Sequence, residues 1–202
     1  YVTINHSDRK PIRLKEGSIG GSALAVSRSG LQLAVTSEQN EAIVYELPAL
    51  DVAVRISDHE RPIWSLAFSK DGEWLASGDD AGIIAIAPIG ATDARVLLQT
   101  KLNEIRDLDF SPGNEKLLAL SGAEQLLVYD LAKHDTSYYT PTTQRLQTGR
   151  FISESEILVG DQAGFLHRVD LIHPTRNRSW KAHKGPIWDV AVHAERAVTC
   201  GQ

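Results

Sequence analysis

The feature that most constrains this chain is an internal repeat with a period of about 41 or 42 residues. Residues 65–72 read SLAFSKDG, and related sequences lie one period before and one period after, ALAVSRSG at 23–30 and DLDFSPGN at 107–114. Near the end of the chain, GPIWDVAV at 185–192 repeats the pattern of RPIWSLAF at 61–68, and a weaker copy precedes it. Five copies at one period predict a repeat architecture in which each copy is one structural unit.

Each unit contains short apolar runs separated by turns, and no run has helical spacing. In the second unit the runs are Ile63–Phe68, Trp74–Ser77 and Ile83–Ile86, with many β-branched and aromatic residues. The turns between them are Ser69–Gly72 and Gly78–Gly82, whose glycines can take positive φ. A fourth run follows in other units. Four strands per unit predict an all-β fold, a β-propeller of four-stranded antiparallel blades that cover one another's faces.

Three segments also carry a family resemblance. They are HERPIWSLAFSKDGEWLASGDDAG at 59–82, VYDL at 128–131 and HKGPIWDVAV at 183–192, and they resemble the WD-repeat family of β-propellers. The resemblance covers nearly the whole chain and is weakest in the fourth unit. Propellers of that family most often have seven blades, so the resemblance implies that these 202 residues, with just under five units, are a fragment of a seven-bladed propeller.

We therefore expect a single incomplete propeller over residues 1–202, with its missing blades supplied by the rest of the polypeptide or by another chain. Residues 1–5, YVTIN, are expected to be the isolated last strand of a blade. The fifth unit stops just inside its second turn. The expected blades are 1–10 (last strand only), 11–57, 58–100, 101–140, 141–181 and 182–202 (first two strands only).

In the WD-repeat family, four side chains of a blade form a structural hydrogen-bonded set. They are a His before the first strand, a Ser or Thr in the second, an Asp in the turn after it, and a Trp at the end of the third. The resemblance assigns His59, Ser77 and Asp80 to the first three roles, whereas Ala87 stands at the Trp position. His183 falls at the repeat position of His59, which predicts the same structural role.

Charge and cysteine content limit the classes of partner and the cellular location that the sequence predicts. Lys and Arg total 21 against 26 Asp and Glu, and the basic residues are scattered, which argues against nucleic acid or an anionic membrane as partner. No apolar run approaches the roughly 18–20 residues of a membrane span. Cys200 is the only cysteine, which excludes a disulfide framework within this chain and favours a reducing, cytoplasmic location. It aligns with Ser77, so we expect a buried structural thiol.

The sequence offers no recognisable metal or catalytic site. The seven histidines are spread over different units, and none is paired with another His or Cys at a ligand spacing, so those other than His59 and His183 are expected on the surface. The turns Gly78–Gly82 and Gly160–Gly164 lack the spaced carboxylates of a calcium loop and the Lys of a phosphate loop. Nothing fixes the geometry of a Ser-His-Asp triad. We expect no cofactor, no metal and no catalysis.

One repeat position varies between units while framework positions stay apolar. It is the residue after Ile63 and its equivalents, which we call the channel-mouth positions: Ser22, Trp64, Arg106, Gln147 and Trp188. The family resemblance places them around the mouth of the central channel. Variation at a position that faces one shared surface is typical of a binding face, and Trp and Arg are enriched in interface hot spots. The residues expected to rim this face are Arg61, Asp79, Glu104 and Lys184.

These features predict a non-catalytic scaffold that binds a peptide or loop of a partner protein on its channel-mouth face. In the competing structural interpretation, Trp64 and Trp188 wedge between adjacent blades. Two functional alternatives belong to other classes: a sensor or targeting module of a larger multidomain enzyme, and a propeller hydrolase with metal ligands or carboxylates in its channel. The hydrolase predicts acidic or His residues at the channel-mouth positions, which the sequence does not show.

Overall fold

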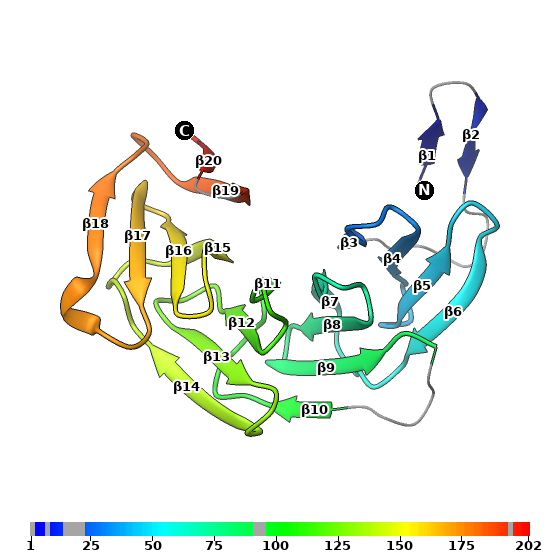
Figure 1. Ribbon diagram of the computed structural model, residues 1–202, viewed down its shortest axis with the longest axis horizontal. Coiled ribbons are helices and arrows are strands. Elements are labelled where there is room, and N and C mark those ends of the chain that lie inside the picture. Colours follow the sequence, from blue (N-terminus) through cyan, green and yellow to red (C-terminus); the bar gives the residue numbers. More distant parts are fainter. Residues whose placement is uncertain (1–2, 7–8, 14–22, 91–95, 194–195) are drawn as a thin grey trace.

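The computed structural model describes residues 3–6, 9–13, 23–90, 96–193 and 196–202. They form four four-stranded and two two-stranded sheets, all antiparallel (Figure 1). Within these ranges the one helical element is the short 3-10 helix η1 (Pro174–Arg176). Among the described residues, no helix has the length and apolar character needed to cross a bilayer. The predicted all-β class with four-stranded antiparallel blades is confirmed.

Each four-stranded sheet is one blade, and its strands follow chain order from one edge to the other. Blade 1 contains β3 (Leu24–Val26), β4 (Gln32–Thr36), β5 (Ala42–Glu46) and β6 (Asp51–Ile56). Blade 2 contains β7 (Ile63–Phe68), β8 (Trp74–Asp79), β9 (Ile83–Pro88) and β10 (Val96–Gln99). Blade 3 contains β11 (Asp107–Phe110), β12 (Lys116–Leu120), β13 (Leu126–Asp130) and β14 (Asp135–Tyr139). Blade 4 contains β15 (Leu146–Phe151), β16 (Glu156–Asp161), β17 (Phe165–Asp170) and β18 (Arg178–Lys181), and blade 5 contains β19 (Ile187–His193) and β20 (Arg196–Gly201).

The blades stand side by side along an arc (Figure 1). Their first strands, β3, β7, β11, β15 and β19, line the inside of the arc, and successive first strands contact one another. The fourth strands, β6, β10, β14 and β18, lie on the outside. All inner strands therefore face a common axis, which is the geometry of a propeller.

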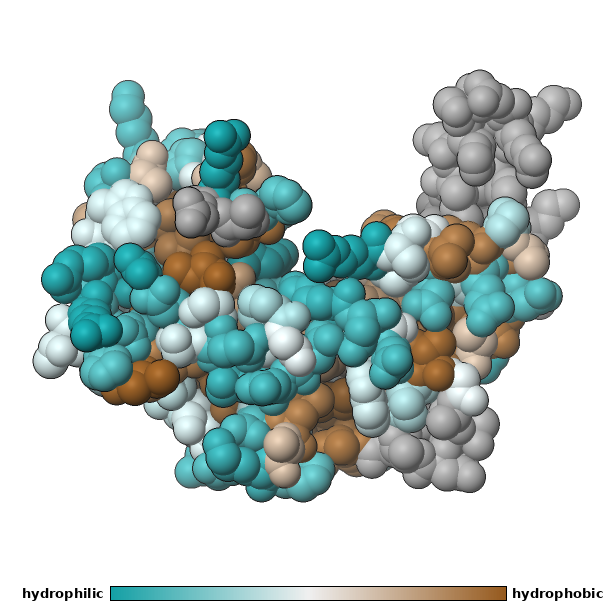
Figure 2. All heavy atoms as spheres, viewed as in Figure 1, coloured by the Kyte–Doolittle hydropathy of each residue, from teal (hydrophilic) through white to brown (hydrophobic). Residues whose placement is uncertain are grey.

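The hydrophobic core lies between neighbouring blades. Val44 and Ile56 of blade 1 share one cluster with Ile63 and Leu75 of blade 2, and equivalent clusters fill the next interfaces. Full burial of one such aliphatic side chain contributes about 1.5–3 kcal/mol. On the face shown in Figure 2, hydrophilic residues cover much of the surface and apolar residues show between them. Each blade therefore depends on its neighbours for stability.

Two glycines allow the next blade to approach closely. A Cβ added at Gly78 would lie 2.3 Å from Cγ2 of Ile105, and one added at Gly160 would lie 2.7 Å from Cγ2 of Ile187. Both isoleucines are fully buried and hold the repeat position of Ile63, directly before a channel-mouth position. At these two interfaces, the isoleucine at or just before the start of the next inner strand packs directly against the glycine.

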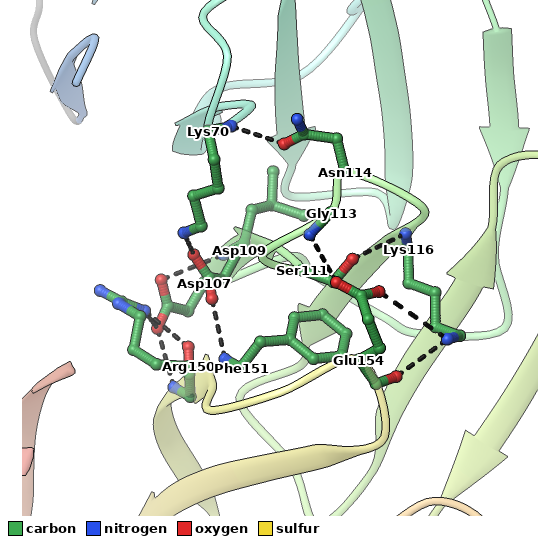
Figure 3. Close-up of polar contacts among 12 residues, drawn as sticks. Lys70, Asp107, Asp109, Ser111, Gly113, Asn114, Lys116, Arg150, Phe151 and Glu154 are labelled. Atoms are coloured by element: carbon green, nitrogen blue, oxygen red, sulfur yellow. Dashed lines mark hydrogen bonds and ion pairs between the residues drawn. The ribbon is translucent and has the colours of Figure 1, made fainter. Parts of the chain in front are cut away.

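Ion pairs join the inner strands of neighbouring blades (Figure 3). Lys70 Nζ donates to Asp109 Oδ1 at 2.6 Å, and Asp109 also accepts the N–H of Phe151, so one carboxylate joins three blades. Arg150 Nη1 lies 2.5 Å from Asp107 Oδ2. Burial raises the pKa of the Asp107 carboxyl, and the Arg150 guanidinium opposes this shift. These pairs are half-buried contacts that hold blade to blade.

The N-terminal strand differs from the prediction. Instead of standing alone as the last strand of a blade, β1 (Thr3–His6) pairs with β2 (Arg9–Arg13) in a separate two-stranded sheet. This hairpin crosses the expected boundary between residues 10 and 11. The strand β2 reads RKPIR, a charged run without apolar alternation, so the sequence pattern did not reveal it.

Candidate protein-binding face

Three of the channel-mouth residues are the extra residues of β-bulges. The strand register shifts between Ile63 and Ser65, between Leu146 and Thr148, and between Ile187 and Asp189. Trp64, Gln147 and Trp188 are thus left without a strand partner, and a bulge re-aims the side chain of its extra residue. The effect is plain in blade 2, where Ile63 is 2% exposed and Trp64 is 37% exposed.

Arg106 reaches the same face from the residue before β11. Its N–H donates to the carbonyl of Leu120 at 2.8 Å. Its guanidinium carbon lies 5.0 Å from the centre of the Trp64 ring. Trp64 in turn donates Nε1–H to Asp80 Oδ1 at 3.2 Å. These contacts place an aromatic ring of blade 2 under a cation of blade 3.

Arg106, Gln147 and Trp188 line one pocket of about 290 Å³, which we call the channel-mouth pocket. It is shared by blades 3, 4 and 5, and its lining also includes Arg145, Gln162 and Pro186. Glu104 lies between two arginines, with Oε2 2.9 Å from Arg106 Nη2 and Oε1 3.9 Å from Arg145 Nη2. The structure thus brings three channel-mouth residues and the predicted rim residue Glu104 together.

The tryptophans keep much of their surface in solvent, 37% for Trp64 and 59% for Trp188. Trp64 lies beside Arg106 of blade 3 at the surface of the blade boundary, so it is not the side chain buried between these blades. Ile63 and Ile187, the residues directly before Trp64 and Trp188, are fully buried against the neighbouring blades.

The sequence also predicts Arg61, Lys184 and Ser22 on this face. Arg61 and Lys184 are exposed, as a rim position requires. Ser22 lies outside the described residues. Sequence reasoning missed Arg145, although it holds the repeat position of Glu104 and the period alone could have placed it on the rim.

A comparison with known protein families finds one matching family model. A family model described as "WD domain, G-beta repeat" matches residues 52–86. Residues 52–86, which span β6 to β9, therefore match one WD repeat. The chain is 26% identical over 170 residues to WD repeat-containing protein 1 of Mus musculus, and the match covers 80% of this chain and 28% of that protein. Autophagy-related protein 18 of Eremothecium gossypii is 32% identical over 122 residues, which cover 59% of this chain and 22% of the relative.

Solved structures support the same fold. The β-propeller domain of Myceliophteria thermophila Cps50 (Swd1) superimposes with a TM-score of 0.74 at 17% identity, covering 89% of this chain and 60% of that domain. The resemblance to WD-repeat propellers is therefore confirmed at the level of sequence motif and fold. The chain spans less than a third of the length of the curated relatives it matches.

The structural set of the WD repeat is present in blade 2, with one correction. His59 Nδ1 lies 2.9 Å from Asp79 Oδ2, and His59 Nε2 lies 2.7 Å from Ser77 Oγ. Because a carboxylate only accepts, Nδ1 carries the proton. Asp79 is fully buried, and its Oδ1 also accepts the N–H groups of Ala81 and Ile83. The acid of the set is therefore Asp79.

Asp79 and Asp80 thus exchange their predicted roles. Asp79 is the last residue of β8 and pairs with Ile63, so its side chain turns inward to His59 rather than to the rim. Asp80 lies one residue further, in the exposed turn, where it accepts the hydrogen bond from Trp64. The repeat carries a signal that separates them, because Asp161 of the fourth unit stands at the position of Asp79 and Gln162 at that of Asp80.

Blades 4 and 5 show variants of the same set. His183 Nε2 lies 2.8 Å from Thr199 Oγ1, in agreement with its predicted structural role. Thr199, and not Cys200, therefore holds the position of Ser77. Cys200, predicted to be buried, is exposed on β20, which is the edge strand of a sheet with two described strands. His167 was expected on the surface, yet it is buried with Nε2 2.9 Å from Asp161 Oδ2. Its place on β17 lets it supply the imidazole of blade 4 from within the sheet.

Proposed function

We propose that this WD-repeat chain is a non-catalytic scaffold that binds a peptide or loop of a partner protein over Trp64, Arg106, Gln147 and Trp188. The observation that carries the proposal is the set of bulges in blades 2, 4 and 5, which free Trp64, Gln147 and Trp188 from strand pairing at one repeat position. The residues directly before them remain buried in the frame. Variation is thereby confined to side chains that a partner can reach.

The chemistry of the face suits protein recognition. Tryptophan and arginine are enriched among residues that dominate interface energies. Arg106 is held between Trp64 and Glu104, so little side-chain entropy is lost when a partner binds. The curated relatives include other WD-repeat proteins, which fits a role in protein interaction.

The class of partner, the location in the cell and the number of blades are parts of the same proposal. A partner that is a protein rather than nucleic acid or membrane is supported by the net charge of -5 and the scattered basic residues. A cytoplasmic location is supported by the single cysteine, and a seven-bladed parent propeller by the family resemblance. The sensor or targeting module of a larger enzyme stays an alternative, because the matched relatives are much longer than this chain.

Site-specific photo-cross-linking in the full-length polypeptide tests the proposed face. A photoreactive phenylalanine analogue at position 188 should cross-link a discrete partner band in cells. The matched control is the same analogue at position 180, where Trp180 is 44% exposed on the outer strand β18. A band obtained equally from both positions, or from position 180 alone, would contradict the proposal.

A further inference from the structure

The channel-mouth pocket contains two arginines that share one carboxylate. The two oxygens of Glu104 face different partners, Oε2 toward Arg106 at 2.9 Å and Oε1 toward Arg145 at 3.9 Å. Arg145 Nε also donates to the carbonyl of Gly122 at 2.5 Å. Glu104 Oε1 lies close to Gly122, where a Cβ would require the flexible carboxylate to shift. The site therefore holds two guanidinium charges against one carboxylate.

The arginines retain hydrogen-bonding capacity beyond these contacts. Each guanidinium has five N–H donors in a planar fork, and the described contacts use only some of them. The side chains of Arg106 and Arg145 are 43% and 59% exposed, whereas that of Glu104 is 19% exposed. The unused donors and the excess positive charge are thus available to a ligand, while the compensating carboxylate is largely covered.

The lining of the pocket also includes apolar side chains. Trp188 and Pro186 of blade 5 contribute them, and Gln147 of blade 4 adds an amide. The volume of about 290 Å³ equals that of roughly ten water molecules at about 30 Å³ each, enough for one acidic side chain. A cationic side chain would meet two guanidiniums and is disfavoured by like-charge repulsion.

We infer that the channel-mouth pocket takes an anionic side chain of the partner segment, either a carboxylate or a phosphate group, beside an apolar residue that packs on Trp188. This inference rests on the proposed function and names the chemistry of its ligand. Arginine forks bind both kinds of anion through paired, charge-assisted hydrogen bonds. The two sources share this chemistry and differ in charge and in the number of acceptor oxygens.

The test is an NMR titration of the nitrogen-labelled full-length protein with short, terminally blocked peptides of Gly and Ser. Each carries one Leu next to a central Glu, phosphoserine or Gln. We expect the Glu or phosphoserine peptide to shift the Nε–H signals of Arg106 and Arg145 and the indole N–H signal of Trp188. Binding should be at least about tenfold tighter than that of the Gln peptide, since hydrogen bonds to charged groups contribute more than neutral ones. Tighter binding of the Glu peptide identifies the carboxylate, and tighter binding of the phosphoserine peptide the phosphate.

Arg145→Gln should reduce affinity for the anionic peptide by at least about tenfold. Arg168→Gln is the matched control, because Arg168 is an exposed arginine paired with Glu156 at 2.7 Å on blade 4. Equal binding of all three peptides, or equal loss in both variants, would overturn the inference. The proposed function is judged separately. If Arg145→Gln leaves the yield of the cross-link from position 188 unchanged, the proposed binding face stands and the anionic ligand is ruled out.

Discussion

The Arg106 guanidinium lies 5.0 Å from the centre of the Trp64 ring, so a cation of blade 3 covers an indole of blade 2. The other functional group of that indole is also engaged, since Nε1–H donates to Asp80. The proposed binding face therefore includes a contact across a blade boundary that forms without a partner.

A double-mutant cycle should measure this contact. Trp64→Ala, Arg106→Ala and the double variant are expected to show a coupling of about 0.5–1 kcal/mol in the free energy of unfolding. The coupling reflects attraction between the guanidinium and the ring face at a partly exposed site. Urea denaturation at low salt provides the measurement, and strictly additive effects of the two substitutions would contradict the contact.

The exchanged roles of the two aspartates can be tested by stability alone. Asp79→Ala should destabilise the fold by about 3 kcal/mol, because it leaves His59 and two backbone N–H groups without their acceptor. Asp80→Ala removes an exposed acceptor and should change the free energy of unfolding by no more than about 0.5 kcal/mol. Urea denaturation of both variants measures this difference. A larger loss of stability in Asp80→Ala than in Asp79→Ala would assign the structural role to Asp80.

Close packing at Gly78 makes a further prediction. Gly78→Ala should destabilise the chain by about 1–3 kcal/mol, since the added Cβ would lie 2.3 Å from Ile105 Cγ2. Ile105→Ala removes the atoms in conflict, so the double variant should lose less than the sum of the two single losses. Thermal and urea unfolding give these values. Strictly additive losses of stability would mean that Gly78 and Ile105 are not in contact.

Stability should also depend on the ionisation of Asp170. The N–H groups of His173 and Ile172 donate to its carboxylate and hold the pKa of Asp170 below its ordinary value of 3.8. A depressed folded-state pKa contributes stability that is present above pH 3.8 and is lost as the pH falls through the folded-state pKa. The urea midpoint of the wild type should therefore fall more steeply below pH 3.8 than that of Asp170→Asn. Parallel curves for the two proteins would contradict this role.

The repeat period predicted more of this molecule than any single motif did. It predicted the four-stranded blades and the equivalence of the channel-mouth positions, because similar units present equivalent residues to similar surroundings. It could not show that Trp64, Gln147 and Trp188 occupy bulges, since a bulge depends on cross-strand register rather than on composition.

Features without repetition were predicted less well. The pairing of β1 with β2 involves a charged strand that has no counterpart in the other units. The burial of His167 depends on the absence of a His before the first strand of blade 4, so that the imidazole comes from a different strand. In both cases the outcome follows from three-dimensional neighbours that one sequence does not specify.

The affinity of the purified full-length protein for the partner found by cross-linking tests the central claim most directly. In a calorimetric titration, Trp64→Ala combined with Arg106→Ala should weaken binding by more than about 2 kcal/mol, or about thirtyfold, while Trp180→Ala leaves it unchanged. Circular dichroism and unfolding curves must show that the double variant remains folded. Unchanged affinity in a folded double variant would contradict the account.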